Sequence, residues 1–265
     1  MTGPDVTDLT KRTVLVVGAG TRPSPDPEAP PGNGRAIAVV AARRGATVVC
    51  ADRDRAAAEA TAELVAAEGA AAHVVEADVA DAGACVDLVA EAHRLGGGDP
   101  LHGMVVNVGI GLGKPAGLAG TTAEQWDATF AVNLRAHFLL AQAALPVMDE
   151  GSSVVFIGSM AGLRPGSRLP AYDASKAGLV GLNRHVALEG ARRGIRSNLV
   201  APGLIDTPLG RAATAGRPSR GRTNVPLGRQ GTAWEVAEVV VFLLTGAAGY
   251  VTGQTIAVDG GLGLI

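Results

Sequence analysis

The sequence predicts an α/β fold, a doubly wound parallel sheet of about seven strands with helices on both faces. Short apolar runs alternate with longer, amphipathic, alanine-rich runs along the whole chain, as expected for strands joined by helical crossovers. The chain has 265 residues, 47% of them hydrophobic, which is enough to bury a full core, and α/β folds of this length are routinely one domain. We therefore expect residues 1–265 to form a single domain.

The apolar runs define the expected strands in chain order. They are Thr13–Val17, Thr47–Ala51, His73–Ala77, Gly103–Asn107, Ser153–Ile157, Arg196–Val200 and Thr255–Val258. The amphipathic runs between them predict helices near Gly34–Arg44, Arg55–Glu68, Ala82–Leu95, Ala123–Leu145, Tyr172–Arg193 and Ala233–Leu244. Thr121 and Glu124 have the spacing of a capping box for the fourth helix, and Pro146 ends its regular pattern.

Charge and terminal composition restrict the partners. With 23 basic and 25 acidic residues the net charge is −2, which does not favour nucleic acid or an anionic membrane as a partner. The N-terminus lacks a basic start followed by an apolar run, and we find no apolar stretch of the roughly 18 residues that a membrane span needs. We expect a cytoplasmic protein that acts on small molecules.

The cysteines and histidines do not have metal-ligand spacing. Cys50 and Cys85 lie in a strand-like and a helix-like segment, and we expect both to be buried thiols. The histidines are expected to be structural or exposed, so no metal is predicted; they are His73, His93, His102, His137 and His185.

Two segments stand out by composition. The first, Thr21–Pro31, holds five of the chain's 15 prolines and predicts a stiff, extended excursion. The second, Pro208–Gly231, is rich in Gly, Arg and Thr, and its length suggests a mobile substrate lid. Its arginines could recognise an acidic or acyl-carrier-bound substrate, although such arginines are more often solvated. They are Arg211, Arg217, Arg220, Arg222 and Arg229.

Glycines after the first strand suggest a nucleotide site. Gly18 and Gly20 follow the strand, and Gly32 and Gly34 open the next helix, where backbone amides can approach a pyrophosphate. Alone this signal is weak, because glycine loops also serve as plain turns and the proline-rich segment breaks the spacing.

Polar residues at the following strand ends support the same site. Asp52, after strand two, would bind the ribose 2′-hydroxyl of NAD and repel the 2′-phosphate of NADP; the alternative is a solvated loop acid. Asp78 and Val79 follow strand three, where Asp78 could face an adenine. Asn107 to Gly109 close strand four, where a cofactor would cross the sheet. We expect NAD, while NADP use stays open because Arg22 and Arg53 could shield a phosphate.

Tyr172 and Lys176 are four apart on a predicted helix and therefore share one face. A tyrosine normally titrates near pKa 10, too high for a base at neutral pH. An ammonium at about 5 Å favours the phenolate by roughly 3 kcal/mol, or about two pKa units, at an effective dielectric of about 20. The pair predicts a phenol made into a general acid/base, and the alternative is a solvated cation–π pair.

These residues resemble the short-chain dehydrogenase/reductase family, in its single-domain branch, from Thr13 to Gly261. The family's catalytic Ser, Tyr and Lys match Ser159, Tyr172 and Lys176, and its helix asparagine matches Asn133. The resemblance also covers the cofactor-binding Pro202-Gly203 and Thr207, and the closing motif Asp259-Gly260-Gly261. It implies a Rossmann-like fold and a nicotinamide cofactor bound by Gly18, Gly32, Gly34, Asp52, Asp78, Val79, Asn107, Gly109, Tyr172, Lys176, Pro202, Gly203 and Thr207.

Two departures from the family pattern stand out. Thirteen residues separate Gly18 from Gly32 where the family has three, an apparent insertion of ten (13 − 3). We hypothesise that this insertion arches beside the cofactor cleft. The family's Asn-Asn-Ala-Gly element is Asn107-Val108-Gly109-Ile110 here, small apolar changes that we expect to leave catalysis intact.

The resemblance implies a dehydrogenase or reductase that transfers a hydride between nicotinamide and a secondary alcohol or ketone. Tyr172 would exchange the substrate proton, Lys176 would lower the tyrosine pKa and bind the ribose, and Ser159 would hold the substrate oxygen. Asn133 would hold a water that connects Lys176 to solvent. In isolation, a serine after a strand such as Ser159 is usually a helix cap or turn hydroxyl, and a mid-helix asparagine such as Asn133 is often a surface residue. The alternatives are a non-catalytic, dinucleotide-sensing regulator and, ranked last for its wider Tyr-to-Lys spacing, an enoyl reductase.

The substrate side and the assembly are predicted from apolar residues. The expected pocket residues are mainly apolar: Ile110, Leu112, Met160, Leu163, Leu204 and Leu209. The fourth and fifth helices are apolar on more than one side, through Phe130, Leu134, Phe138, Leu139, Leu179, Leu182 and Val186. A homodimer or homotetramer follows, and the family resemblance favours the tetramer.

Overall fold

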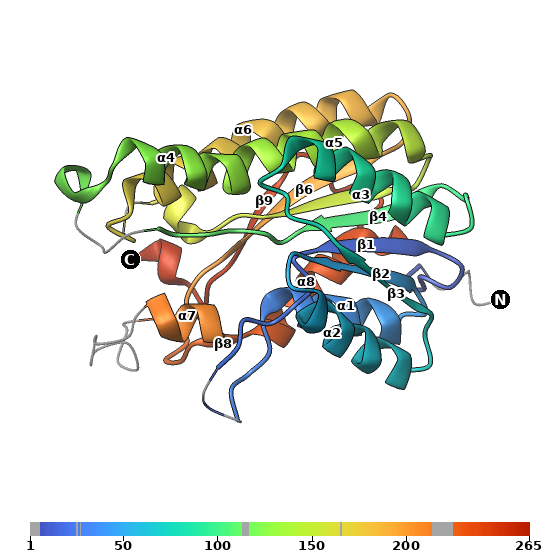
Figure 1. Ribbon diagram of the computed structural model, residues 1–265, viewed down its shortest axis with the longest axis horizontal. Helices are drawn as coiled ribbons and strands as arrows, with labels where there is room; N and C mark the ends of the chain where they lie inside the picture. The colour runs from blue at the N-terminus through green and yellow to red at the C-terminus, as the bar shows by residue number, and fades with distance from the viewer. Residues whose placement is uncertain (1–5, 25, 27, 113–116, 165, 214–224) are drawn as a thin grey trace.

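The computed structural model describes residues 6–24, 26, 28–112, 117–164, 166–213 and 225–265. Its main sheet has seven parallel strands in the order β3-β2-β1-β4-β5-β6-β9, which confirms the predicted fold class (Figure 1). The strands are β1 (Thr13–Val17), β2 (Thr47–Asp52), β3 (Ala72–Glu76), β4 (Leu101–Val106), β5 (Ser153–Ile157), β6 (Arg196–Pro202) and β9 (Thr255–Val258). Two short strands, β7 (Ile205–Asp206) and β8 (Gly231–Thr232), pair with each other outside this sheet.

Helices cover both faces of the sheet, with α1, α2 and α8 on one side and α3 to α6 on the other (Figure 1). Their bounds are α1 (Asn33–Arg43), α2 (Arg55–Ala67), α3 (Ala82–Leu95), α4 (Ala123–Phe130), α5 (Ala136–Ala144), α6 (Pro170–Ala191), α7 (Pro208–Ala213) and α8 (Ala233–Leu244). The chain reverses its winding direction between β1 and β4, so the crevice at their carboxyl ends is the expected ligand position.

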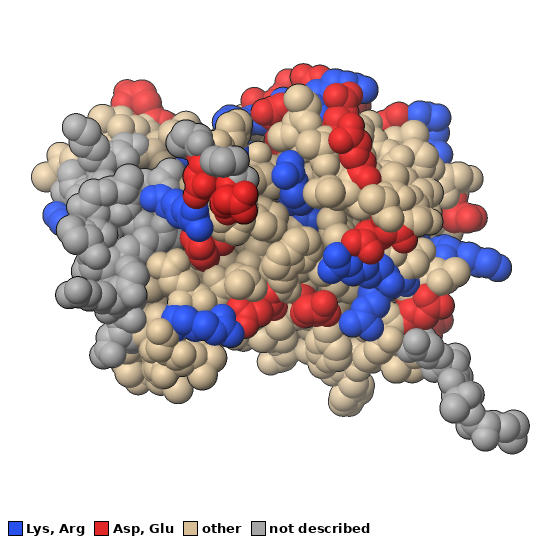
Figure 2. Space-filling view, turned by 90° about the horizontal axis from the view of Figure 1, so that it is seen from below, with Lys and Arg blue, Asp and Glu red and all other residues tan. Residues whose placement is uncertain are grey.

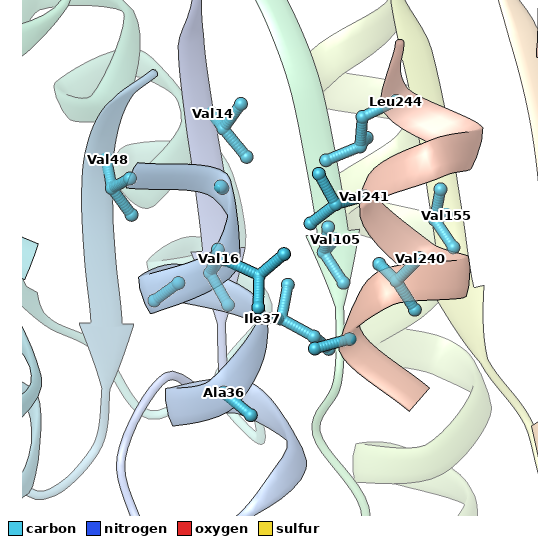
Figure 3. Packing of buried hydrophobic residues seen from close by; sticks show 14 of the residues in the cluster. Val14, Val16, Ala36, Ile37, Val48, Val105, Val155, Val240, Val241 and Leu244 are labelled. Carbon is cyan, nitrogen blue, oxygen red and sulfur yellow. The ribbon is translucent and has the colours of Figure 1, made fainter. Parts of the chain in front are cut away.

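Alternate residues of β1 supply the two halves of the core, because side chains of a strand point to opposite faces. Val14 and Val16 pack with Ile37 of α1 and Val240 of α8 on one face (Figure 3). Leu15 and Val17 belong to the cluster on the other face. Every β1 residue is buried, which accounts for the unbroken apolar run that follows Thr13.

The predicted fourth helix is interrupted. A π-helical turn, Ala131–Arg135, separates α4 from α5, and it contains Asn133. The capping box is also one residue later than expected: the Thr122 hydroxyl accepts from the Gln125 backbone N–H, and the Gln125 side chain accepts from the Thr122 N–H. A π turn has no compositional signal here, since the apolar periodicity continues through it.

By length and composition, one helical stretch of the described residues, Ala123–Val147, could cross a membrane. This corrects the expectation that no stretch is long and apolar enough. In this fold α5 packs against α3, and α4 against α6. On the face shown in Figure 2, basic and acidic side chains are interspersed.

Only part of the apolar surface expected for assembly is exposed. Leu179 and Val186 are buried within the chain's own core, so they cannot serve as assembly contacts. Phe138 is 46% exposed, and Leu188 of the same layer of helices is 73% exposed. An apolar face therefore remains on α5 and α6.

The predicted lid is described only in part. Its first residues form α7 and its last form the approach to β8, while Arg217, Arg220 and Arg222 lie outside the described residues. The described arginines are paired within the chain. Arg211 contacts Asp26 and Asp206, and Arg229 contacts Glu235.

Candidate active site

A cleft of about 280 Å³ lies at the carboxyl ends of β1, β2 and β4. It brings together most of the residues predicted to bind a cofactor: Gly18, Gly32, Asp52, Asp78, Val79, Asn107, Gly109 and Thr207. The other residues predicted to bind the cofactor do not line it: Gly34, Tyr172, Lys176, Pro202 and Gly203. The insertion contributes Thr21, Arg22 and Pro23 to the wall, which agrees with the hypothesis that it lies beside the cleft.

The glycine loop is shaped for close approach. Gly18 has φ +82°, a left-handed conformation that favours glycine, and its N–H donates to the Ala51 carbonyl at 2.8 Å. A Cβ on Gly34 would lie 1.8 Å from the Gly18 carbonyl oxygen, so Gly34 serves the packing of α1 against the loop rather than the cleft itself. The Asn107 side chain also donates to that carbonyl oxygen, at 2.8 Å.

Two polar features of the cleft suit a dinucleotide. Gly32, the N-cap of α1, has no side chain to occupy the first-turn amides, which leaves them suited to a phosphate. The Asn33 side-chain oxygen is buried and has no hydrogen-bond partner among the described residues. Because a buried acceptor without a partner is costly, it fits a hydroxyl of a bound nucleotide.

Asp52 is oriented by the backbone. One carboxylate oxygen accepts from Gly20 N–H at 2.9 Å and the other from Asp54 N–H at 3.1 Å. Each oxygen retains a further lone pair, and the carboxylate lines the cleft, so it can accept from a ribose hydroxyl. The position agrees with the predicted role.

The catalytic candidates converge behind the cleft. Lys176 is only 4% exposed, and its ammonium donates to the Ile157 carbonyl at 2.8 Å. It lies 6.0 Å from the centre of the Tyr172 ring. A Cβ on Gly109 would stand 3.2 Å from this ammonium, so the lysine reaches the rim of the cofactor cleft.

Ser159 follows β5, where its hydroxyl accepts from Ala161 N–H at 3.1 Å and caps a short 3-10 turn. The Ser159 side chain also acts on Tyr172, because its hydrogen bond lowers the pKa of that phenol.

Burial is the largest cause of the pKa shifts of both Tyr172 and Lys176. It raises the pKa of Tyr172, against the effect of Ser159, and it lowers the pKa of Lys176 to about 8. The effect of Lys176 on the tyrosine pKa stays a prediction, because the net shift is upward here and burial is its largest cause. The Coulomb argument left out desolvation of the phenolate, and the ammonium is directed at Ile157 instead.

The Asn133 side chain is held by hydrogen bonds to Ile110 and Ser175. The side chain is fully buried; its oxygen accepts from Ile110 N–H at 2.8 Å, and its amide donates to the Ile110 carbonyl at 2.9 Å and to the Ser175 hydroxyl at 3.1 Å. It therefore pins the loop after β4, and the amide has no hydrogen left for a water. That Asn133 holds a water that connects Lys176 to solvent stays a prediction.

Two residues of this region were missed by sequence reasoning. The Ser175 hydroxyl donates to the Tyr172 carbonyl at 2.8 Å and links it to Asn133; a serine three residues after the tyrosine was the available signal. His137 is fully buried one helical turn after Asn133, and neither ring nitrogen has a partner in good hydrogen-bond geometry among the described residues, although contacts with the Val132 and Val106 backbone oppose the fall in its pKa. Burial, with the nearby Lys176 charge, holds the pKa of His137 well below its usual range.

The predicted substrate residues separate into groups. Ile110 and Leu209 line the cofactor cleft, and Met160 and Leu163 line a second hollow with Arg164. Leu112 and Leu204 line neither.

Cys50 and Cys85 are buried as predicted, and burial raises their pKa to about 12 and about 11, which makes them unreactive. No cluster of metal-binding side chains occurs within the described ranges.

Comparison with known proteins adds to this geometry. A family model described as "Enoyl-(Acyl carrier protein) reductase" matches residues 30–263. The chain is 40% identical over 235 residues to "Inactive 2-(S)-hydroxypropyl-CoM dehydrogenase 2" of Xanthobacter autotrophicus, covering 85% of this chain and 99% of that protein. It is 35% identical to "(3R)-3-hydroxyacyl-CoA dehydrogenase" of Canis lupus familiaris, covering 96% of this chain and 97% of that protein.

Solved structures show the same similarity. A short-chain dehydrogenase/reductase from Serratia marcescens superposes with a TM-score of 0.85 and 31% identity over 96% of this chain and 99% of that one. A dehydrogenase from Agrobacterium tumefaciens with bound NADP superposes with a TM-score of 0.82 and 32% identity, over 97% of this chain and 98% of that one.

Proposed function

This chain belongs to the short-chain dehydrogenase/reductase family, and from that premise we propose that it transfers a hydride between a nicotinamide cofactor and a secondary alcohol or ketone. The observation that carries the proposal is the position of Lys176, whose ammonium reaches Gly109 at the rim of the cleft while it stays on the helix that bears Tyr172. The cleft's glycines, Asn33 and Asp52 fit a dinucleotide, which would supply the hydride acceptor or donor and, when oxidised, a positive charge.

The chain's own residues would move the proton. In alcohol oxidation Tyr172 takes the hydroxyl proton, and in ketone reduction it returns one to the oxygen. Ser159 donates to the substrate oxygen and holds it within reach of the phenol. Since burial raises the pKa of Tyr172, the positive charges of Lys176 and the oxidised cofactor are both needed to favour the phenolate.

Asn133 acts through position. Its side chain fixes Ile110, which lines the cleft, and through Ser175 it is joined to the backbone of Tyr172. The polar contacts of Asn133 therefore couple the wall of the cleft to the helix of the proton donor. We assign it as a positioning residue.

We propose NAD as the preferred cofactor, because Asp52 presents a carboxylate to the cleft and would repel a 2′-phosphate. Arg22 and Arg53 line the same cleft and keep NADP use open. Turnover with each cofactor at equal concentration decides this preference.

For the substrate, we propose a secondary alcohol. The names of two relatives describe a hydroxypropyl and a hydroxyacyl group joined to a coenzyme. Ile110 and Leu209 offer apolar contacts. The described lid arginines do not support an acidic substrate, since Arg211 and Arg229 are already ion-paired. We further propose a homodimer or homotetramer through the exposed face of α5 and α6, and a cytoplasmic location.

A non-catalytic, dinucleotide-sensing regulator is the second candidate, and the relative named as inactive gives it support. One experiment separates the two. NADH formation is measured with a panel of secondary alcohols for the wild type and for Tyr172→Phe, after fluorescence titration shows that both bind NADH. Turnover by the wild type alone supports the enzyme. Binding without turnover of any alcohol or ketone supports the regulator, and equal rates in both proteins would place the proton chemistry elsewhere.

A further inference from the structure

We propose that an ion pair between Asp26 and Arg211 clasps the insertion to the opposite wall of the cofactor cleft, and that this clasp slows cofactor release. The inference rests on the proposed function, because it takes the cleft to bind a nicotinamide dinucleotide. It gives the insertion a role as a positioning element for cofactor binding.

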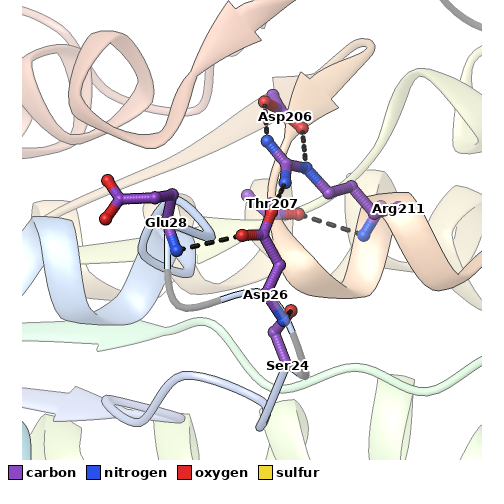
Figure 4. A network of polar contacts seen from close by, with 7 residues as sticks. Ser24, Asp26, Glu28, Asp206, Thr207 and Arg211 are labelled. Carbon is purple, nitrogen blue, oxygen red and sulfur yellow. Dashed lines mark hydrogen bonds and ion pairs between the residues drawn. The ribbon is translucent and has the colours of Figure 1, made fainter.

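Arg211 is held by two carboxylates at once (Figure 4). Its Nε and Nη2 form a bidentate pair with Asp206, both at 2.8 Å, and its Nη1 contacts Asp26 at 2.8 Å. Asp206 lies on β7, so this bidentate pair anchors the guanidinium to that strand. The planar guanidinium can serve both partners because its donors point in different directions.

The insertion presents Asp26 in a defined orientation. The Asp26 N–H donates to the Ser24 hydroxyl at 3.2 Å, and the Asp26 carboxylate accepts from Glu28 N–H at 3.0 Å. At the base of the insertion, Gly32 N–H donates to the Thr21 hydroxyl at 3.0 Å and closes the excursion. A carboxylate fixed by its own turn loses less freedom when it pairs than a free side chain would.

Hydrogen bonds also fix the backbone around Arg211, on the other side of the ion pair. Gly210 N–H donates to the Thr207 hydroxyl at 3.1 Å, and Arg211 N–H donates to the Thr207 carbonyl at 2.8 Å, so the first turn of α7 is bound to the residue that begins the wall. Figure 1 shows the loop between β1 and α1 extending beside α7 and β8.

The ion pair therefore joins two walls of one cleft. Thr21, Arg22 and Pro23 of the insertion line it, as do Thr207, Pro208 and Leu209. The clasped residues are 185 apart in the sequence, yet each lies within three residues of the wall that it holds. Loss of the ion pair frees the two walls to separate, and a bound dinucleotide would leave faster.

The sign of the effect distinguishes a clasp from simple electrostatics. A dinucleotide carries a negatively charged pyrophosphate, so removal of a nearby carboxylate should by itself strengthen binding. Removal of a carboxylate that holds the cleft together should weaken it. Asp26 and Arg211 are 47% and 41% exposed, so the expected effect is modest, about two- to fivefold.

The test compares Asp26→Asn with Glu28→Gln, which removes the same charge from the same segment. The Glu28 side chain makes no ion pair within the described ranges. NADH dissociation constants and release rates are measured by stopped-flow fluorescence at low and high salt, in the wild-type and Tyr172→Phe backgrounds. We expect Asp26→Asn to raise both quantities about two- to fivefold and to reduce the salt dependence of release.

We expect Glu28→Gln to leave NADH binding unchanged or slightly stronger, and Arg211→Gln combined with Asp26→Asn to be no worse than Arg211→Gln alone. Release from Asp26→Asn at the wild-type rate, or an equal increase in Glu28→Gln, overturns the clasp and leaves the proposed function standing. Failure of the wild type to bind any nicotinamide dinucleotide overturns both.

Discussion

The Lys176 ammonium donates to the Ile157 carbonyl oxygen at 2.8 Å, so a charged side chain on α6 is bound to the carboxyl end of β5. Burial lowers the pKa of Lys176 to about 8, which is a cost of keeping the charge in the site at neutral pH. The site is thus less stable than an apolar one, as functional sites often are.

Lys176→Met should stabilise the protein at pH 7 while it abolishes hydride transfer. The unfolded lysine titrates near 10.5, so between pH 8 and 10.5 the unfolded chain binds a proton that the folded chain lacks. The free energy of unfolding therefore falls as the pH drops through this range. Below pH 8 the buried charge of Lys176 costs the folded wild type about 3 kcal/mol. Lys176→Met removes this cost but also loses the hydrogen bond to Ile157, which contributes about 1 kcal/mol.

Urea unfolding at pH 7 and pH 10 checks this expectation. The variant should exceed the wild type by about 2 kcal/mol at pH 7, and the difference should shrink at pH 10. A variant that is less stable than the wild type at pH 7 would contradict it.

Alcohol oxidation should depend on pH more steeply than ketone reduction. Oxidation needs the phenolate of Tyr172, and burial raises the pKa of that phenol, so the rate should rise with pH through and above neutrality. Reduction needs the protonated phenol and should fall only at higher pH. Profiles of kcat/KM for both directions test this, and an oxidation rate independent of pH from about 6 to 9 would exclude Tyr172 as the base.

Asn133→Ala should loosen the cleft. The change leaves the Ile110 N–H and carbonyl without their side-chain partners and removes the donor to Ser175. We expect a loss of about 2 to 3 kcal/mol in the free energy of unfolding, together with weaker NADH binding. Ser175→Ala, which removes only one of these contacts, serves as the milder control. NADH affinity unchanged in Asn133→Ala would show that Ile110 does not shape the cleft.

His137→Leu should be as stable as the wild type or more stable at neutral pH, because it removes two buried nitrogens without partners. Burial depresses the pKa of His137 in the folded chain, while the unfolded residue titrates near 6.5. Below about pH 6.5 the unfolded chain binds the extra proton, so this residue makes the free energy of unfolding fall as the pH drops.

Urea unfolding at about pH 5 and pH 7.5 measures how much the free energy of unfolding changes with pH in the wild type and in His137→Leu. The variant should lose less stability at the acidic pH than the wild type does. An equal loss in the variant and in the wild type would mean that His137 is not held neutral by the fold.

Local sequence patterns predicted the fold and most of the cleft, but not the features that depend on burial. The apolar run Val14 to Val17 predicted a buried strand. The position of Asp52 after strand two predicted that its carboxylate lines the cleft. The π turn at Asn133 has the same apolar periodicity as a regular helix, so nothing marked it. The rise in the Tyr172 pKa could not be predicted, because it depends on how far the phenol is buried, and a spacing of four residues gives no information on burial.

Asp52→Ala should move the cofactor preference toward NADP. The carboxylate is held by Gly20 and Asp54 N–H groups at the cleft, where it would bind the NAD ribose and repel a 2′-phosphate. Loss of a charged hydrogen bond should weaken NAD binding about tenfold or more, and loss of the repulsion should strengthen NADP binding. The ratio of kcat/KM for NAD to that for NADP should therefore fall by more than tenfold.

Asp54→Ala is the matched control, since Asp54 also lines the cleft but its carboxylate caps α2 by accepting from Ala57 N–H at 3.1 Å. It removes the same charge, so a general electrostatic effect would shift the preference in both variants. A shift confined to Asp52→Ala assigns the discrimination to a direct contact with the ribose. An equal or larger shift in Asp54→Ala would move that contact two residues along the chain and remove the basis for assigning NAD from Asp52.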